Sequence, residues 1–277
     1  MLGKRIRLER IVNRETGKSV VVPMDHGVTV GPIQGIEDMR QMVNAVAEGG
    51  ANAVLGHMCL PLYGHRHYGK DVGLILHLSG STVWSPYPNA KVLVNSVENA
   101  LRNGADGVSV HINIGAVNEA DMLRDLGMVS VKCMEWGMPL LAMMYTRGAK
   151  VKSESDPEAV RHAARIAAEL GADLVKVTYT GSAASFRQVT QGCPIPVLIA
   201  GGEKADTDRQ VFENVRGALG AGGAGVCIGR NVFQHRDPLS MMRAISAMVH
   251  ENASTDDAVT ILGAGKKRAG RKGQFLK

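Results

Sequence analysis

Aromatic side chains are scarce in this sequence of 277 residues, where Phe, Trp and Tyr together make up 4%. Proteins that bind single-stranded nucleic acids stack bases on aromatic side chains, so this scarcity argues against that class. Long hydrophobic runs are also missing, because the longest, 138–145, is far shorter than the roughly 20 residues that span a bilayer. The charged start, MLGKRIRLERIVNRE, lacks the apolar segment of a secretory signal. We therefore expect a cytoplasmic protein with no membrane partner.

Cysteine is scarce as well. The four cysteines, Cys59, Cys133, Cys193 and Cys227, are scattered without a Cys-x-x-Cys spacing. Such an arrangement predicts neither a disulfide framework nor a zinc site, and reduced, mostly buried thiols are expected.

An excess of basic charge exists in one place only. The sequence has 32 Lys and Arg against 26 Asp and Glu. Residues 263–277 contain Lys266, Lys267, Arg268, Arg271, Lys272 and Lys277 and no acid, so the remaining body is balanced at 26 of each sign. We predict a basic, disordered tail over 263–277 and no nucleic-acid partner; an anion-binding arm is the alternative.

Short strands and helices alternate along residues 1–262. Eight apolar runs rich in β-branched residues recur, as parallel strands covered on both faces should. They are 19–24, 53–56, 74–78, 107–112, 139–145, 173–178, 196–200 and 225–229. Helical patterns lie between them, among them 36–48, 156–170, 206–219 and 237–250. Asp156-Pro157 and Asp237-Pro238 each pair a capping acid with proline at the first helical position.

Eight strands that alternate with helices are the number that a (β/α)8 barrel needs. An open doubly wound sheet is the alternative, but the segment after the first strand, DHGVTVGP, lacks a G-x-G-x-x-G turn. We therefore predict one α/β domain over 1–262, a single (β/α)8 TIM barrel.

Catalytic groups of such a barrel lie at the carboxyl ends of its strands, where Lys176 is the most informative residue. It stands between Val175 and Val177, where a solvated ammonium would be out of place. Burial favours the neutral amine, which can condense with a ketone to form a Schiff base. An ion pair inside the barrel is the alternative.

Two further residues can move protons at the carbinolamine and enamine stages of a Schiff-base reaction. Asp25 follows the first predicted strand and Tyr145 ends the fifth. Taken singly, Asp25 could be a helix cap and Tyr145 an aromatic at the rim. Combined with Lys176, they favour catalysis.

Glycine turns end the last two strands, at Gly201-Gly202 and Gly229-Arg230. Barrels build phosphate sites from the loops after strands seven and eight, so a phosphate subsite is predicted here. The nine histidines, which include His57, His65, His67, His77 and His111, show no recognised ligand spacing on one element. No metal site is therefore predicted.

Several separated motifs resemble one family. They include Arg7-Leu-Glu-Arg-Ile, Val22-Pro-Met-Asp-His-Gly-Val, Gly31-Pro-Ile, Ala47-Glu-Gly-Gly-Ala-Asn-Ala-Val, Gly137-Met-Pro-Leu-Leu-Ala-Met-Met-Tyr and Gly229-Arg-Asn. The sequence resembles the class I aldolases of archaeal type, relatives of fructose-bisphosphate aldolase. Within them it is most similar to the 2-amino-3,7-dideoxy-D-threo-hept-6-ulosonate synthases. The likeness runs from about residue 3 to residue 258.

The resemblance implies roles for named residues and no metal or organic cofactor. Lys176 would form the Schiff base with a ketone donor, Asp25 would accept a proton and Tyr145 would donate one. The substrate-binding residues would be Asp25, His26, Gly27, Val28, Thr29, Tyr145, Thr146, Arg147, Gly201, Gly202, Gly229 and Arg230. The last four would hold a phosphate.

The resemblance also implies a reaction and an assembly. A phosphorylated three-carbon keto fragment would pass from a phosphorylated ketose donor to the aldehyde L-aspartate semialdehyde. The product would be 2-amino-3,7-dideoxy-D-threo-hept-6-ulosonate, which leads to 3-dehydroquinate and the aromatic amino acids. A homo-oligomer, such as a decamer, is expected.

Three positions depart from the family's pattern. Met58 stands where a basic residue is usual, Thr146 replaces proline after the tyrosine, and Glu203 replaces proline after the double glycine. These changes leave the lysine chemistry alone but keep two alternatives open, a class I fructose-bisphosphate aldolase and a dihydroxyacetone-phosphate-dependent aldolase acting on aspartate semialdehyde. The run Met144-Tyr-Thr-Arg counts against the first, whose family tends to carry Trp-Tyr-Pro-Arg.

Overall fold

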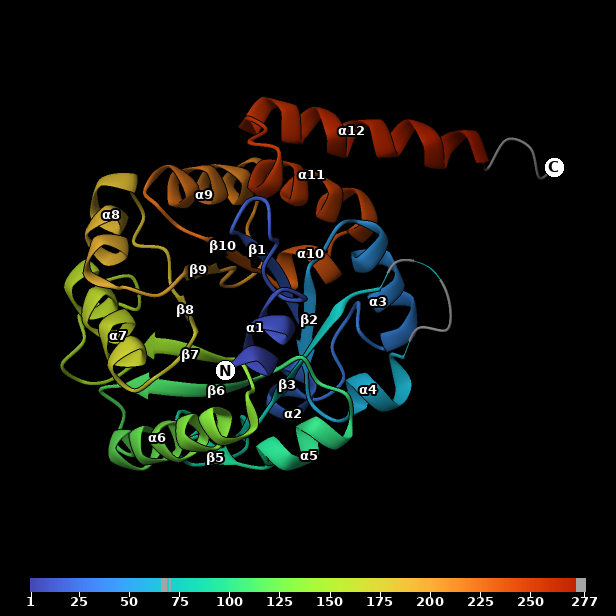
Figure 1. The fold of residues 1–277 in the computed structure, drawn as a ribbon. Coiled ribbons are helices and arrows are strands. Elements are labelled where there is room, and N and C mark those ends of the chain that lie inside the picture. The colour runs from blue at the N-terminus through green and yellow to red at the C-terminus, as the bar shows by residue number, and fades with distance from the viewer. Residues whose placement is uncertain (66–68, 70, 273–277) are drawn as a thin grey trace.

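A closed parallel barrel forms the centre of the computed structural model, which describes residues 1–65, 69 and 71–272 (Figure 1). Its strands are ordered β1-β10-β9-β8-β7-β6-β3-β2. Their bounds are β1 Ser19–Pro23, β2 Ala53–Gly56, β3 Gly73–His77, β6 Gly107–Ile114, β7 Leu140–Thr146, β8 Leu174–Val177, β9 Val197–Ala200 and β10 Gly225–Cys227. The predicted TIM barrel is confirmed, and each predicted strand overlaps an observed one.

Helices surround the barrel in Figure 1. They are α1 Leu2–Leu8, α2 His26–Val30, α3 Met39–Glu48, α4 Cys59–Tyr63, α5 Val97–Arg102, α6 Glu119–Trp136, α7 Pro157–Glu169, α8 Ala183–Gly192, α9 Asp208–Gly220, α10 Arg230–Phe233, α11 Pro238–His250 and α12 Thr255–Lys272. The two predicted caps are confirmed: Asp156 accepts from the Ala159 amide and Asp237 from the Ser240 amide, each at 3.0 Å. Proline at the next position loses no hydrogen bond there.

The alternation of side chains along the strands decides what fills the barrel. Every second residue points inward, and the inner apolar cluster includes Leu55, Ile75, Leu141, Leu174 and Leu198. Ile11 belongs to the same cluster and is 1% exposed. Two residues nearer the carboxyl ends of their strands, buried polar side chains begin, with His77 after Ile75 and Lys176 after Leu174.

A small hairpin that the sequence did not reveal follows β3. Its strands, β4 Ser79–Gly80 and β5 Val92–Leu93, are two residues long, too short for a recognisable pattern. The side-chain amide of Asn113 on β6 donates to the backbone carbonyl of Asn89 at 2.7 Å. The backbone N–H of Val83 donates to the backbone carbonyl of Thr29 at 2.9 Å. These bonds hold segment 81–91 over the carboxyl end of the barrel.

The C-terminal segment corrects the predicted domain boundary. Helix α12 continues to Lys272, so residues 263–272 extend a helix instead of forming a disordered tail. Ala258 and Leu262 are buried one turn apart, which anchors this helix (red in Figure 1) against the barrel's other helices. Residues 273–277 lie outside the described residues.

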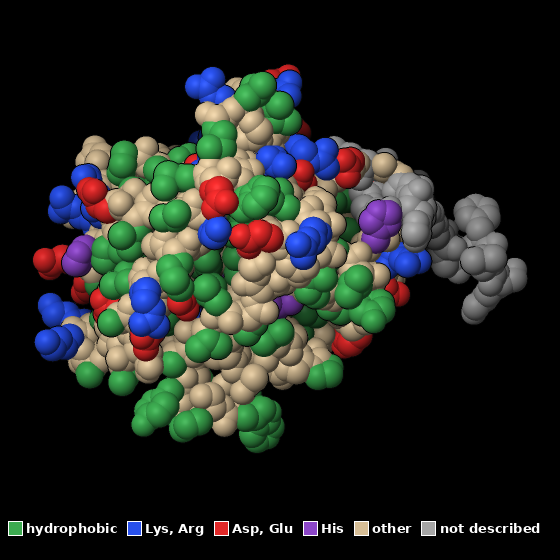
Figure 2. All heavy atoms as spheres, turned by 60° about the horizontal axis from the view of Figure 1, so that its bottom comes forward, with side chains coloured by type: hydrophobic (Ala, Val, Ile, Leu, Met, Phe, Trp, Pro, Cys, Tyr) green, Lys and Arg blue, Asp and Glu red, His purple; other side chains and the backbone are tan. Residues whose placement is uncertain are grey.

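The outer surface carries charges of both signs. On the face shown in Figure 2, basic and acidic side chains are interspersed among hydrophobic ones. Such mixing creates no strong field of one sign on that face. Within the part of the chain that the structure describes, no helix has the length and apolar character needed to cross a membrane.

Candidate active site

Lys176 faces the interior of the barrel. It lies two residues after the inward-facing Leu174 on β8 and is 5% exposed. Tyr145 lies on the neighbouring strand β7, two residues beyond Met143, which is the register partner of Lys176. The Lys176 Nζ lies 5.8 Å from the centroid of the Tyr145 ring. Strand alternation alone therefore brings these two predicted residues together.

The pKa of Lys176 lies above the usual lysine value, whereas burial alone would favour the neutral amine expected from the sequence. Burial lowers its pKa, but Cys227, Tyr145 and Asp25 raise it, and the balance stays above the usual lysine value. Burial raises the pKa of the Cys227 thiol to about 11, so this thiol is uncharged at neutral pH. Asp25 is then the anion that keeps the proton on Lys176, which must lose this proton before it can attack a ketone.

Asp25 occupies the N-cap position of α2, but its side chain makes no capping hydrogen bond. The structure therefore excludes the helix-cap alternative. Its carboxylate lies 3.8 Å from His26 Nδ1 and 3.9 Å from His77 Nε2, and 18% of its side chain is exposed. Burial alone would raise the pKa of Asp25, but the potential of His77, His26 and Lys176 outweighs burial and holds the pKa below its usual range. Asp25 is ionised when the donor arrives.

A pH dependence follows from this pairing. The rate at which borohydride traps a donor on Lys176 should rise with pH, because only the neutral amine reacts. Removing the negative charge with Asp25→Asn removes an interaction that raises the lysine pKa, so the midpoint of that rise should move to lower pH. Trapping rates measured by mass spectrometry across a pH series give both midpoints. An unchanged midpoint would show that Asp25 does not hold the lysine proton.

A cavity of about 330 Å³ opens beside Lys176 at the carboxyl ends of β7 to β10. Its walls bring together most of the predicted residues: His26, Tyr145, Arg147, Lys176, Gly201, Gly202, Gly229 and Arg230. Five predicted residues are absent from these walls, within the described residues: Asp25, Gly27, Val28, Thr29 and Thr146. The Thr146 hydroxyl instead donates to the Glu154 carbonyl at 3.1 Å. The Met58 sulfur accepts from Asn99 of α5 at 3.6 Å, so this position adds no charge to the cavity.

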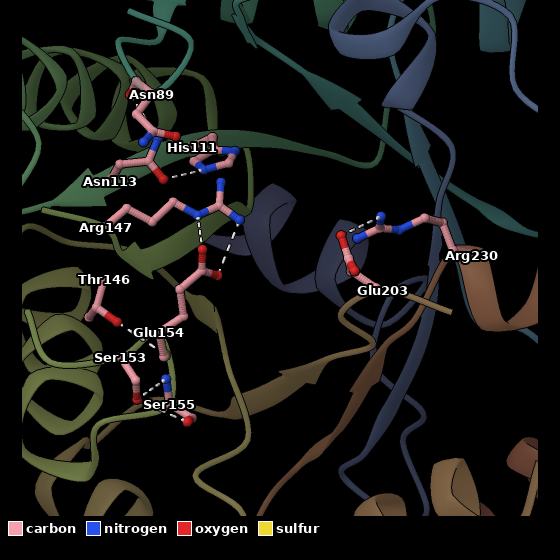
Figure 3. A network of polar contacts seen from close by, with 10 residues as sticks. All are labelled: Asn89, His111, Asn113, Thr146, Arg147, Ser153, Glu154, Ser155, Glu203 and Arg230. Carbon is pink, nitrogen blue, oxygen red and sulfur yellow. Dashed lines mark hydrogen bonds and ion pairs between the residues drawn. The ribbon is translucent and has the colours of Figure 1, made fainter. Parts of the chain in front are cut away.

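Arg230 has unused hydrogen-bonding capacity. Its Nε is buried without a partner, and its Nη1 lies 3.8 Å from the Glu203 carboxylate, too far for a hydrogen bond (Figure 3). Glycine is required on both sides of this site for different reasons. A Cβ on Gly229 would lie 2.6 Å from the Pro23 carbonyl oxygen, while Gly202 has a φ of +65°. The two turns therefore leave room for an anion beside a donor that lacks a partner.

Arg147 is held differently. Its Nε donates to Glu154 at 2.7 Å and its Nη2 to the other oxygen of the same carboxylate at 3.3 Å (Figure 3). The guanidinium carbon lies 4.6 Å from the centroid of the Tyr145 ring. This arrangement fixes the tyrosine from one face and leaves the charge of Arg147 compensated.

Asn231, which sequence reasoning did not single out, joins the two glycine turns. Its amide donates to the Gly201 carbonyl at 2.8 Å and to the Glu203 carbonyl at 3.0 Å. Its oxygen accepts from the Ala205 amide at 2.7 Å. The side chain is 5% exposed. The signal was present in the Gly229-Arg-Asn motif, but only the structure shows that this asparagine positions the loop after β9.

Three histidines line the side of the barrel near β2, β3 and β6. The rings of His57 and His77 meet edge to face at 5.1 Å, and His111 lies 4.8 Å from the Tyr145 ring. Burial lowers the pKa of all three, that of His77 to about 3, so they are neutral at pH 7. Among the described residues no group of His, Cys, Asp and Glu is arranged to hold a metal ion. Arg66 and His67 lie outside them.

Comparisons with known proteins agree on one family. Residues 19–235 match the profile of the DeoC/LacD family aldolases. The chain is 39% identical to 2-amino-4,5-dihydroxy-6-oxo-7-(phosphonooxy)heptanoate synthase of Streptomyces griseus, covering 95% of this chain and 96% of that protein. It is 42% identical to 2-amino-3,7-dideoxy-D-threo-hept-6-ulosonate synthase of Halobacterium salinarum, covering 94% and 97%.

A solved structure shows the same architecture. It is an archaeal fructose-1,6-bisphosphate aldolase whose catalytic lysine is covalently bound to the carbinolamine intermediate of its substrate. The TM-score is 0.81 at 33% identity, and the alignment covers 89% of this chain and 99% of that one.

Proposed function

This chain belongs to the DeoC/LacD family of aldolases, and from that premise we propose that it joins a three-carbon keto fragment of a phosphorylated ketose to L-aspartate semialdehyde through a Schiff base on Lys176. It is a class I aldolase, as its relatives are. The product is a seven-carbon amino acid, such as 2-amino-3,7-dideoxy-D-threo-hept-6-ulosonate. Its role is to supply the aromatic amino-acid route through 3-dehydroquinate.

The chemistry proceeds on the lysine itself. The Lys176 amine attacks the donor ketone, and loss of water from the carbinolamine gives an iminium ion. Breaking a carbon–carbon bond of a ketose donor releases the rest of the donor as an aldehyde and leaves an enamine on Lys176; with dihydroxyacetone phosphate, loss of a proton from carbon gives the enamine instead. The enamine carbon then attacks the acceptor aldehyde. Water hydrolyses the resulting iminium, releases the product and restores the lysine. During these reaction steps Tyr145 acts as the proton donor and Asp25 as the proton acceptor.

The observation that carries this proposal is the position of one lysine. Lys176 is nearly inaccessible, interacts with the Asp25 anion, lies 5.8 Å from the centroid of the Tyr145 ring, and borders the cavity whose walls include Arg230. A lysine with a purely structural role would need neither the proton-transfer groups nor the opening. The arrangement supports an imine at this position with the donor's phosphate toward β9 and β10.

Product identification tests the proposal. The purified protein is incubated with L-aspartate semialdehyde and, in turn, dihydroxyacetone phosphate, fructose 1,6-bisphosphate or a deoxy-ketohexose phosphate. A seven-carbon amino acid in the mass spectrum is expected. The products named for the two relatives differ at carbon 7, which is phosphorylated in one and deoxygenated in the other, so the product mass assigns the donor.

The same assay separates the fructose-bisphosphate alternative. Rapid cleavage of fructose 1,6-bisphosphate without aspartate semialdehyde, and no seven-carbon product with it, would replace the proposed substrates and leave the Schiff-base chemistry in place. A cytoplasmic location and a homo-oligomer stay predictions from the sequence.

Arg230 provides a test of where the phosphate binds. Replacing it by alanine removes a charge-assisted hydrogen bond and should lower kcat/KM for phosphorylated donors by about ten- to a hundredfold. The reaction of dihydroxyacetone, which has no phosphate, should barely change. Arg209→Ala is the matched control, since Arg209 pairs with Asp256 on the outer surface, away from the cavity. An equal loss for both donors would mean that Arg230 supports the barrel and that the phosphate binds elsewhere.

A further inference from the structure

A buried lysine that the mechanism does not use lies beside the cluster of neutral histidines. Lys91 immediately precedes β5 and is 7% exposed. Its Nζ donates at 2.7 Å to the Ser81 hydroxyl, which donates onward to the Pro88 carbonyl at 2.6 Å. The hydrogen-bond partner of this ammonium is thus a neutral hydroxyl. A buried cation with such a partner retains most of its capacity to bind an anion.

The barrel places Lys91 across the mouth from the phosphate turns. In the closed order of strands, β3 and β6 lie opposite β9 and β10. The hairpin that carries Lys91 follows β3, and Asn113 of β6 holds it through the Asn89 carbonyl. Figure 3 shows the Asn89–Asn113 contact on one side and Arg230 on the other. Lys176 and Tyr145, on β8 and β7, lie between these sides.

Other charges near Lys91 do not cancel it. The charge of Lys91 lowers the pKa of His57, His77 and His111, and all three histidines are neutral at pH 7. The Arg147 guanidinium, which also interacts with Lys91, is compensated by Glu154. Asp25 is the anion that interacts with Lys91, and it also interacts with Lys176. This side of the mouth is therefore suited to an incoming carboxylate.

We propose that Lys91 binds the carboxylate of the acceptor aldehyde. The inference rests on the proposed function and places the acceptor subsite next to the cavity, on the side of the barrel mouth where Asn113 holds the hairpin and His111 lies against Tyr145. In a seven-carbon product the carboxylate is carbon 1 and the imine carbon is carbon 6, so the carboxylate extends away from Lys176. When the transferred fragment carries its phosphate at carbon 7, as in the phosphorylated product, and this phosphate is held toward β9 and β10, the carboxylate extends toward β3 and β6. Lys91 would thus select an aldehyde that bears a carboxylate.

The test compares two aldehydes with the full-length enzyme. Lys91→Met keeps the length of the side chain and removes its charge. We expect kcat/KM for L-aspartate semialdehyde to fall by about ten- to a hundredfold, mainly through KM, as the loss of a charge-assisted hydrogen bond predicts. For an uncharged aldehyde such as propanal, kcat/KM should change less than about twofold. Lys91→Arg, which keeps the positive charge, should retain part of the preference for L-aspartate semialdehyde over propanal.

Ser81→Ala is the matched control. It removes the same hydrogen bond within the hairpin but keeps the Lys91 charge, so it should preserve the preference for the carboxylate-bearing aldehyde. Borohydride trapping of the donor on Lys176, which needs no acceptor, should be unchanged in Lys91→Met and also shows that this variant is folded.

Three results would overturn the inference. An equal fall in kcat/KM for both aldehydes in Lys91→Met, or no fall for either, would mean that Lys91 only stabilises the hairpin or only influences the charge of Asp25. If Ser81→Ala lost the preference for the carboxylate-bearing aldehyde as fully as Lys91→Met, the selectivity would depend on the structure of the hairpin and not on the charge of Lys91. Wild-type enzyme that traps the donor without preferring the carboxylate-bearing aldehyde would also refute the subsite, whereas failure of wild-type trapping would refute the proposed function itself.

Discussion

Borohydride added to this enzyme together with a phosphorylated ketose is expected to leave the reduced donor attached to Lys176 and to no other lysine. The expectation follows from the position of Lys176 beside the cavity and close to Asp25 and Tyr145. Lys176→Arg should abolish both trapping and turnover, because a guanidinium stays protonated and cannot add to a ketone. Digestion and mass spectrometry locate the adduct.

The matched control is the same substitution at another lysine of restricted exposure. Lys4 of α1 pairs at 2.8 Å with Asp173, which directly precedes β8, and neither residue lines the cavity, so Lys4→Arg should trap the donor as the wild type does. Chelators should leave activity intact, since the lysine itself acts as the electron sink. An adduct on a different lysine, or complete loss of activity with EDTA, would contradict the assignment.

The second large effect is expected from the phenol of Tyr145. Tyr145→Phe keeps the ring that contacts Arg147 and His111 and removes only the hydroxyl. Imine formation should persist, while turnover should slow by about two to four orders of magnitude, the usual contribution of a positioned acid or base. Asp25→Asn should slow turnover comparably. Rapid-quench measurement of trapping and steady-state measurement of kcat separate the two stages.

Tyr179→Phe is the control for this substitution. Tyr179 packs against Phe186 with ring centroids 5.3 Å apart and does not border the cavity, so loss of its hydroxyl should leave kcat near the wild-type value. A Tyr145→Phe enzyme with near wild-type turnover would assign the proton to another donor. A variant that lost imine formation as well would place the hydroxyl at an earlier step.

The local pattern of the sequence was enough to place Lys176 and Tyr145, the two residues proposed for catalysis, on the inner face of their strands. Side chains alternate along a strand even when both faces of the strand are covered. Lys176 stands two residues after Leu174 and Tyr145 two residues after Met143, so both point to the same face as these inner residues once the strands are assigned. Helix caps at Asp156 and Asp237 were predictable for a similar reason, because a cap bonds to an amide three residues along the same chain.

Contacts between distant segments could not be predicted in this way. Asn231 donates to two carbonyls of the loop after β9, thirty and twenty-eight residues away in sequence. The hairpin that follows β3 is built from strands too short to leave a pattern. The helical course of residues 263–272 was missed because their composition is typical of a solvated tail, whereas burial of Ala258 and Leu262 anchors the helix that continues into them.

The sequence by itself determined the order of strands and helices, the inward position of Lys176 and Tyr145, and the glycines at the ends of β9 and β10. Each of these depends on neighbours within a few residues, where backbone geometry and side-chain period act directly. Only the closed barrel decided the raised pKa of Lys176, the unpartnered Nε of Arg230 and the interaction of Lys91 with Asp25. Those properties depend on burial and on charges from strands far apart in the chain, whose separation is fixed only when the sheet closes.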